Sequence, residues 1–361
     1  MAYVETYAGA WPGTQPHLEL RPAAGPSTAR DVGRLVQVDP RRGTTIVPFR
    51  ELPSALEAGD LLVVNDAATM PASLRGEHDG AELEVRLLAR LDETRFQAVL
   101  FGAGDHRTRT ELRALPPVVE SGDRLRLGAL TAEVVRVSPR FDRLVELRFD
   151  REGSALWAAL YASARPVQYS HQSELLELWS VQTLYAAEPW AVEMPSAGRP
   201  LSFRVLRELR RRGVQLAAVT HAAGLSASGD PVLDRALPLP ERYRIPAATV
   251  DKISEARRAG SRVLAVGTSV VRALEGSFRA SGACLPGEGI TSLRIGGEHS
   301  LALVDELLTG LHAPGESHFE LLSAFVERPQ LERALTLAAA SGLRSHEFGD
   351  SMIVWRHELR H

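Results

Sequence analysis

The stretch RVLAVGTSVVRALEGSF, Arg262–Phe278, joins a short apolar run to an amphipathic one. The run Val263–Val266 is apolar at every position, as in a strand that a parallel sheet buries on both faces. Beyond Gly267 the apolar residues recur at helical spacing, at Val270, Val271, Leu274 and Phe278. We expect Thr268 or Ser269 to cap this helix. A strand, a tight turn and a helix in this order predict one unit of an α/β sheet.

The turn at Gly267 is also a suitable place for a ligand, because ligands of open α/β sheets bind at the carboxyl ends of the strands. Glycine lets a ligand approach the backbone closely, and the first N–H groups of a helix are free to bind an anion. Arg272 lies one turn into the helix and is expected to point back toward this place. The spacing alone fits a plain strand–helix joint equally well.

Composition places the chain among ordinary soluble globular proteins. It has 361 residues, of which 44% are hydrophobic and 24% charged, enough for two or three domains. The net charge of −3 and the pI of about 6.4 give no global sign of nucleic-acid binding. The one cysteine, Cys284, excludes an intrachain disulfide and a multi-cysteine metal site. Without a span-length apolar run or a signal-peptide pattern, we expect a cytoplasmic protein.

The chain divides into three parts by pattern. Residues 1–29 are rich in Pro, Gly and Ala and are expected to be an irregular lead-in. Residues 30–73 and 151–361 alternate strand and helix patterns, which predicts an α/β domain with a mixed or mostly parallel sheet and flanking helices. Residues 74–150 show only short strand patterns, so we expect an inserted small β-barrel or sandwich domain.

Polar residues follow several of the expected strands. Asn65 and Asp66 end one apolar run, Thr220 and His221 end another, and a loop at His312–Ser317 and a turn at Gly349-Asp350 add more. If these edges meet, they line one cleft with hydroxyls, amides, imidazoles and carboxylates. Each feature alone is more typical of a turn or of a structural histidine than of a ligand site. Tyr169, Trp179, Tyr185 and Trp190 form either a wall for a flat ligand or a core segment between domains.

Several motifs are absent from the sequence. It contains no HExxH, no Walker A loop, no GxGxxG that opens a helix and no GxSxG elbow. His312 and His318 are six residues apart across Pro314, which is poor spacing for two ligands on one helix. We therefore expect no metal site.

A series of short blocks then carries a specific similarity. In chain order they include GDLLVVND (Gly59–Asp66), VQTLYA (Val181–Ala186), PSAG (Pro195–Gly198), AVGTSVVRALE (Ala265–Glu275), LLTGLHAPGES (Leu307–Ser317) and FGDSMIV (Phe348–Val354). Together they resemble the S-adenosylmethionine:tRNA ribosyltransferase-isomerase family of queuosine biosynthesis, over about Arg30 to Trp355.

The resemblance implies an α/β domain interrupted by a β-barrel, and S-adenosylmethionine as a co-substrate that donates its ribosyl part, with no metal. The acceptor in that family is the aminomethyl group of a 7-deazaguanine base in tRNA, and adenine and methionine are released. Such chemistry needs a base beside the sulfonium, an adenine contact and an anion site for the methionine carboxylate. The catalytic candidates are His221, His312 and Asp66. The substrate-binding candidates are Arg30, Asn65, Ser196, Gly198, Thr220, Gly267, Thr268, Ser269, Arg272, Ser317 and Asp350.

The chain also departs from the family pattern. Ala67, Ala68 and Ser73 stand where the family usually has Thr, Arg and Arg, and the Gly198–Phe203 segment lacks the family's histidine. Lost arginines and an acidic pI weaken the case for a tRNA partner, for which Arg210–Arg212 is the one dense basic cluster. Three hypotheses therefore stand: the tRNA enzyme, a paralogue with a small-molecule acceptor, and a non-catalytic binding protein on the same scaffold.

Overall fold

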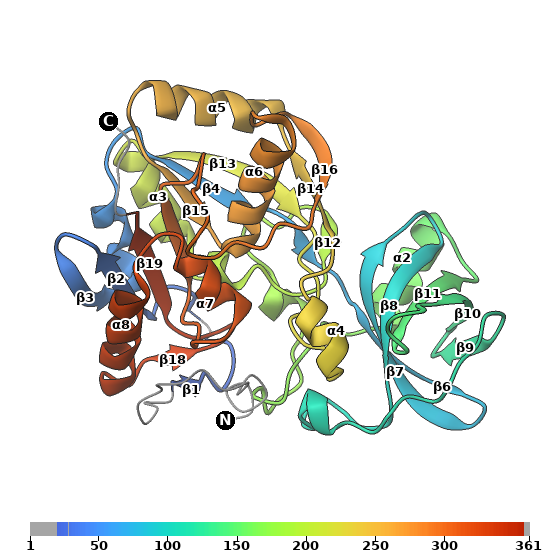
Figure 1. Cartoon of the computed structure of the whole chain (residues 1–361). Coiled ribbons are helices and arrows are strands. Elements are labelled where there is room, and N and C mark those ends of the chain that lie inside the picture. Colours follow the sequence, from blue (N-terminus) through green and yellow to red (C-terminus); the bar gives the residue numbers. More distant parts are fainter. Residues whose placement is uncertain (1–19, 28, 357–361) are drawn as a thin grey trace.

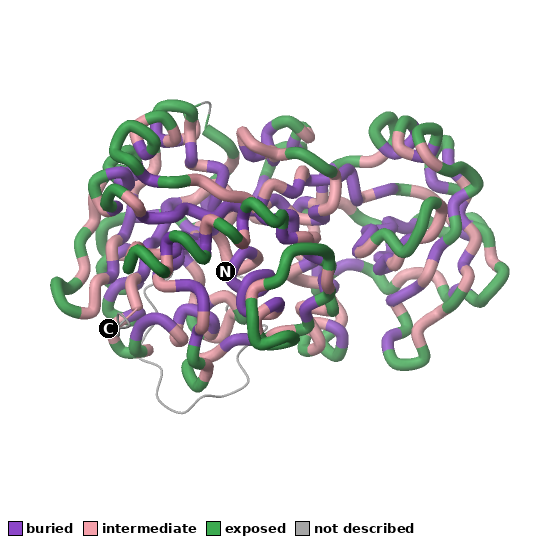
Figure 2. Tube along the Cα trace, turned by 90° about the horizontal axis from the view of Figure 1, so that it is seen from above, coloured by how far each residue is buried: buried purple, intermediate pink, exposed green. Residues whose placement is uncertain are grey.

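A computed structural model describes residues 20–27 and 29–356 of the chain. They form a large α/β lobe and a smaller β-barrel lobe that lie side by side (Figure 1). Seen from above, buried residues run through the middle of both lobes (Figure 2). In the described part of the chain no helix is long and apolar enough to span a membrane.

The large lobe is built on one nine-stranded sheet with the order β16-β14-β13-β4-β15-β17-β19-β2-β3. Its strands are β2 (Arg34–Asp39), β3 (Gly43–Pro48), β4 (Leu61–Asn65), β13 (Gln215–His221), β14 (Glu241–Ile245), β15 (Val263–Val266), β16 (Gly287–Thr291), β17 (Glu306–Gly310) and β19 (Ser351–Trp355). The central strands β13, β4, β15 and β17 pair in parallel, whereas β14, β16, β19 and β3 each make an antiparallel pair. The predicted mixed sheet is confirmed.

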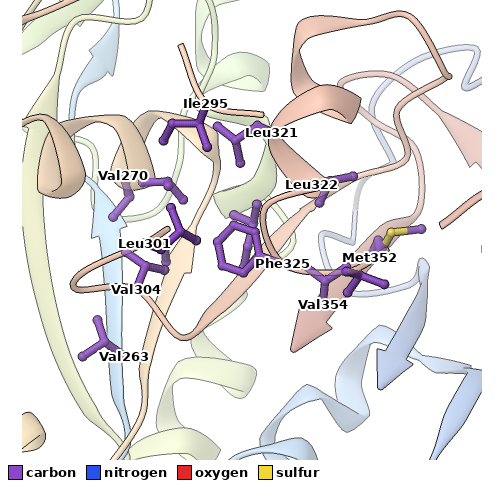
Figure 3. Close-up of a cluster of buried hydrophobic side chains, with 14 of the residues drawn as sticks. Val263, Val270, Ile295, Leu301, Val304, Leu321, Leu322, Phe325, Met352 and Val354 are labelled. Atoms are coloured by element: carbon purple, nitrogen blue, oxygen red, sulfur yellow. The ribbon is translucent and has the colours of Figure 1, made fainter. Parts of the chain in front are cut away.

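Helices cover both faces of this sheet. One face carries α5 (Ala247–Arg258), α6 (Thr268–Ser281), α7 (Ser317–Leu322) and α8 (Arg328–Ala340), and the other carries η1 (Phe49–Ala55) and α3 (Phe203–Arg211). Alternate residues of β4 enter the two cores: Leu61 and Val63 pack on the first face, Leu62 and Val64 on the second. Figure 3 shows part of the first core, where Phe325 lies between Leu301 on one side and Val354 on the other.

The smaller lobe is a closed barrel with the order β10-β11-β8-β7-β6-β9. Its strands are β6 (Ser73–His78), β7 (Ala81–Arg90), β8 (Arg95–Phe101), β9 (Arg124–Leu127), β10 (Leu130–Val137) and β11 (Leu144–Phe149). The barrel is thus confirmed over the sandwich. Helix α2 (Gly153–Ser163) packs Leu156 and Leu160 into the barrel core, so it belongs with this lobe by contact. The exact domain limits at 73/74 and 150/151 stay predictions.

Short elements complete the described chain. They are β1 (Arg21–Pro22), β5 (Ala68–Thr69), η2 (Thr110–Leu112), η3 (Leu178–Val181), β12 (Pro189–Ala191), η4 (Ser196–Gly198), α4 (Pro231–Ala236) and β18 (Arg344–Ser345). Most of the predicted irregular lead-in, residues 1–19 and 28, lies outside the described residues. Within its described part, β1 pairs in parallel with β18.

Glu275 on α6 fixes the loop that leads into β17. Its buried carboxylate accepts backbone N–H bonds from Ala302, Leu303 and Val304 at 2.8, 2.8 and 3.0 Å. Because three loop amides depend on one side chain, its loss leaves several buried donors without partners.

We predict that Glu275→Ala lowers the free energy of unfolding by about 2–4 kcal/mol, because each unsatisfied buried group costs about 1–3 kcal/mol. Glu275→Gln keeps one oxygen acceptor and loses less. Urea denaturation measures both variants. If both unfold at the wild-type urea concentration, these bonds do not hold the loop.

Candidate functional site

A cavity of about 500 Å³ opens at the carboxyl ends of the central parallel strands. His221 ends β13, Gly267 follows β15, and Thr309 and Gly310 end β17; all line the cavity. The first turn of α6, η4 and the start of α7 contribute further walls. Its size suits a nucleoside-sized ligand.

Gly267 shapes the turn between β15 and α6. Its φ of 91° is a conformation that L side chains rarely adopt, and its N–H donates to the carbonyl of Leu308 at 2.8 Å. Gly267 itself is the N-cap of α6 and no side chain caps the helix, so the predicted capping by Thr268 or Ser269 is wrong. The amides of Thr268 and Ser269 begin the helix, where no carbonyl of a preceding turn can accept from them.

Arg272 is held by two partners on the cavity wall. Its Nη1 donates to Glu241 and its Nε donates to the carbonyl of Leu293 at 3.0 Å. Glu241 therefore balances the positive charge of Arg272, which we expected to bind an anionic ligand. One donor, Nη2, is buried without a hydrogen-bond partner among the described residues. A ligand that reaches Arg272 therefore meets its Nη2 group rather than the whole guanidinium.

His221 is fully buried beside this pair. Its Nε2 lies 3.3 Å from the Oε2 of Glu241, yet neither ring nitrogen makes a hydrogen bond to a described residue. Burial, and next the charge of Arg272, lower the pKa of His221 to about 3. The ring is therefore neutral at physiological pH and a weak base.

His312 and His318 stack face to face on another wall, with ring centroids 4.6 Å apart. Nε2 of His312 lies 3.0 Å from the Thr309 hydroxyl, and its Nδ1 lies 3.3 Å from Glu316. Burial, and next His312, lower the pKa of His318 to about 3. Both nitrogens of His312 are thus engaged, which fixes the ring in the cavity.

A further group of lining residues comes from loops that the strand pattern does not include: Tyr169, His171, Glu193, His346 and Glu347. Sequence reasoning singled out only Tyr169 among them, as part of an aromatic segment. Of the other aromatic residues in that segment, Trp190 lines a second cavity of about 180 Å³ beside the barrel, and Trp179 is exposed. The four aromatics therefore do not form one wall.

His171, His346 and Glu347 are the one set of potential metal ligands found in the described part of the chain. Nε2 of His171 lies 2.5 Å from Glu347, and the two imidazole rings stack at 4.3 Å with an angle of 19°. The Glu347 carboxylate already contacts His171. The geometry favours a hydrogen-bonded pair, and the absence of a metal stays a prediction.

The cavity brings together eight of the residues predicted from sequence: Ser196, His221, Gly267, Thr268, Ser269, Arg272, His312 and Ser317. Six others are not among its lining residues: Arg30, Asn65, Asp66, Gly198, Thr220 and Asp350. For most of these six, the structure shows a partner that already occupies the side chain.

Asn65 is buried and acts as a link. Its Nδ2 donates to the His221 carbonyl at 3.0 Å and to Ser269 Oγ at 3.3 Å, and its Oδ1 accepts from the amides of His221 and Ala67. Asp66 accepts from Thr220 Oγ1 at 2.7 Å, and burial raises its pKa although that bond opposes the change. Neither residue is among those that line this cavity.

The remaining three residues have packing or linking contacts. A Cβ on Gly198 would lie 1.9 Å from the Tyr185 hydroxyl, so only glycine fits there. Arg30 donates to the carbonyl of Gln182 at 2.7 Å. Asp350 accepts from the amides of Arg34 and Arg344, both at 2.7 Å.

None of the predicted basic cluster Arg210–Arg212 is among the lining residues of the cavity. Arg211 lines a separate hollow with Arg50, Arg204 and Arg207, and that hollow shares no lining residue with the cavity.

Comparison with known proteins decides the family. The model of the family described as "Queuosine biosynthesis protein" matches residues 19–354. The chain belongs to the queuosine biosynthesis protein family. The resemblance predicted from the sequence blocks is thereby confirmed.

Relatives in this family cover nearly the whole chain. S-adenosylmethionine:tRNA ribosyltransferase-isomerase of Methylobacterium radiotolerans is 33% identical over 92% of this chain and 94% of its own. The protein of the same name from Thermus thermophilus is 32% identical over 90% and 93%. The crystal structure of S-adenosylmethionine tRNA ribosyltransferase from Thermotoga maritima covers 93% of this chain and 98% of its own, at 25% identity with a TM-score of 0.51.

The neutral state of His221 makes stability depend on pH. The folded protein binds no proton there until pH approaches 3, whereas the unfolded chain binds one below about 6.5. The unfolded state thus takes up more protons as pH falls, and stability falls with it.

We predict that between pH 7 and pH 5 the wild-type protein loses about 2 kcal/mol more unfolding free energy than His221→Leu, which cannot titrate. Urea unfolding at both pH values measures this difference. An equal loss in the two proteins would show that the folded ring titrates with the ordinary pKa of a histidine.

Proposed function

We propose that this protein transfers the ribosyl part of S-adenosylmethionine to the aminomethyl group of a 7-deazaguanine base in tRNA and rearranges it to an epoxycyclopentane. Adenine and methionine leave in the reaction. The observation that carries the proposal is the match to relatives named for this activity over more than nine tenths of both chains. A tRNA acceptor makes the cytoplasm the expected compartment.

The cavity supplies suitable groups for S-adenosylmethionine. We assign the methionine carboxylate to the amides of Thr268 and Ser269 together with Nη2 of Arg272, because a helix N-terminus and a guanidinium N–H both favour an anion. Ser196 and Ser317 offer hydroxyls to the ribose or the adenine edge. His312 lies in the same cavity, where Thr309 and Glu316 hold its ring.

The direct test is adenine release from labelled S-adenosylmethionine in the presence of tRNA that carries 7-aminomethyl-7-deazaguanine. The proposal expects release that depends on this tRNA and labelled ribosyl carbons in the tRNA. Release that needs only a small acceptor would contradict the tRNA assignment. Binding without release under either condition would contradict the enzymatic assignment.

Two glycines of α6 provide a matched test of where the co-substrate binds. Gly267 at the N-terminus has a φ of 91° and Gly282 at the C-terminus a φ of 75°. A Cβ at Gly282 meets nothing within 4 Å, and Gly282 is not a lining residue. Alanine strains the backbone at both positions, by about 1–3 kcal/mol.

We predict that Gly267→Ala weakens S-adenosylmethionine binding about tenfold or more, because the carboxylate loses a charge-assisted bond worth about 1.5–3 kcal/mol. Gly282→Ala should leave the dissociation constant within about twofold. Isothermal titration calorimetry compares the two. Equal effects on binding would move the carboxylate away from this turn.

A further inference from the structure

Glu193 lines the cavity from the segment between β12 and η4. Three hydrogen bonds from described residues end on its Oε1: one from the Tyr169 hydroxyl, one from the Ser226 amide at 2.8 Å and one from the Ser226 hydroxyl at 3.1 Å. Oε2 accepts none of these bonds. Oε1 thus anchors the carboxylate, whereas Oε2 has no hydrogen-bond partner among the described residues and can accept a proton.

Glu193 also differs from the other glutamates of the cavity in its charge balance. Glu241 forms an ion pair with Arg272 and Glu320 with Arg328, whereas Glu316 and Glu347 each contact a histidine, His312 and His171. For Glu193 no ion pair is found among the described residues. Asp234 likewise has no ion pair within the described part of the chain. Its Oδ1 accepts two hydrogen bonds of 2.6 Å from Ser228, in the turn before α4.

The surroundings of Glu193 disfavour its negative charge. Burial is the main cause that raises the pKa of Glu193 to about 7; Glu347 raises it further, and the bonds from Tyr169 and Ser226 lower it. The Arg86 guanidinium lies over the Tyr169 ring at 5.3 Å, but it donates to Glu84 at 2.7 Å. His171 stacks on Tyr169, but its Nε2 is in hydrogen-bond contact with Glu347. A carboxylate in this state is matched to proton transfer near neutral pH.

We propose that Glu193 is the base that removes a proton from C5′ of S-adenosylmethionine, the ribose carbon bonded to the sulfonium. This inference rests on the proposed function. The C5′–H bond breaks, the proton goes to Oε2, and the electron pair stays on C5′ beside the positive sulfur. Charge and atoms balance without an oxidant or another reactant.

The other titratable groups of the cavity are less suited to this step. His221 and His318 have a pKa of about 3 and are weak bases. Both nitrogens of His312 face partners, Thr309 and Glu316. Asp66, which the sequence suggested as a catalytic residue, is not among the lining residues and accepts from Thr220.

The test compares the wild-type protein with Glu193→Gln. The amide oxygen of glutamine can accept the same three bonds, so the anchor is kept while the base is removed. Glu255→Gln, on the exposed face of α5, is the matched control. Two readouts are followed from pH 5.5 to 8.5: adenine release with modified tRNA, and deuterium uptake at C5′ of S-adenosylmethionine recovered from D₂O.

We expect wild-type adenine release to rise with pH through about 7 and then level off, because the base must be ionised. Glu193→Gln should lower release about 10²–10⁴-fold, remove that rise and abolish deuterium uptake. Glu255→Gln should follow the wild type. If Glu193→Gln does not fold, Glu193→Asp replaces it, and a pH-dependent rate well below that of the wild type is expected.

The outcomes separate this inference from the proposed function. Release by Glu193→Gln at the wild-type rate and with the wild-type pH profile overturns the role of Glu193 and leaves the function intact. Deuterium uptake that requires Glu193, without adenine release from any tRNA, supports the base and overturns the function. Neither release nor uptake by the wild-type protein overturns both.

Discussion

The side-chain amide of Asn65 ties together the elements that meet at the carboxyl edge of the sheet. It bonds the backbone of His221 at the end of β13 through both a donor and an acceptor, and it reaches Ser269 in the first turn of α6. A buried amide is costly unless its polar atoms are satisfied, so this arrangement is strongly determined. Asn65 thereby holds His221 and Ser269, two residues that line the cavity, in place.

Charged side chains in the lining of the cavity contact one another. Arg272 and Glu241 neutralise each other beside a neutral His221, and Nε2 of His171 lies within hydrogen-bond distance of Glu347. Buried pairs of this kind hold side chains in fixed positions, because breaking one leaves an uncompensated charge. The groups that we assign to the ligand are the α6 amides, Nη2 of Arg272 and the carboxylate of Glu193, and Arg235 and Arg294 also line the cavity.

The sequence allowed the sheet to be predicted because short apolar runs such as Val263–Val266 and Leu61–Val64 have few other uses in an α/β chain. Polar residues at the strand ends correctly located Gly267, Thr268 and His221 in one cavity. Asn65 and Asp66 follow the same pattern but bond within the protein. The pattern cannot distinguish a residue that faces a ligand from one that satisfies a neighbouring backbone group.

The residues that were missed come from loops. Glu193, His171 and Glu347 have no periodicity to mark them, and their place in the cavity is set by the packing of distant segments. Glu241 begins a strand, where a charged residue is usually solvated, and only the structure shows its pairing with Arg272. The low pKa of His221 likewise follows from complete burial, which its neighbours in sequence do not indicate.

The central claim is that S-adenosylmethionine occupies the cavity at the end of β13, β15 and β17. A crystal structure of the protein with S-adenosylmethionine tests it most directly. The account predicts the methionine carboxylate at the amides of Thr268 and Ser269 and C5′ within hydrogen-bond distance of Glu193. Density for the ligand in the second cavity instead, against Trp190 and Arg242 beside the barrel, would contradict it.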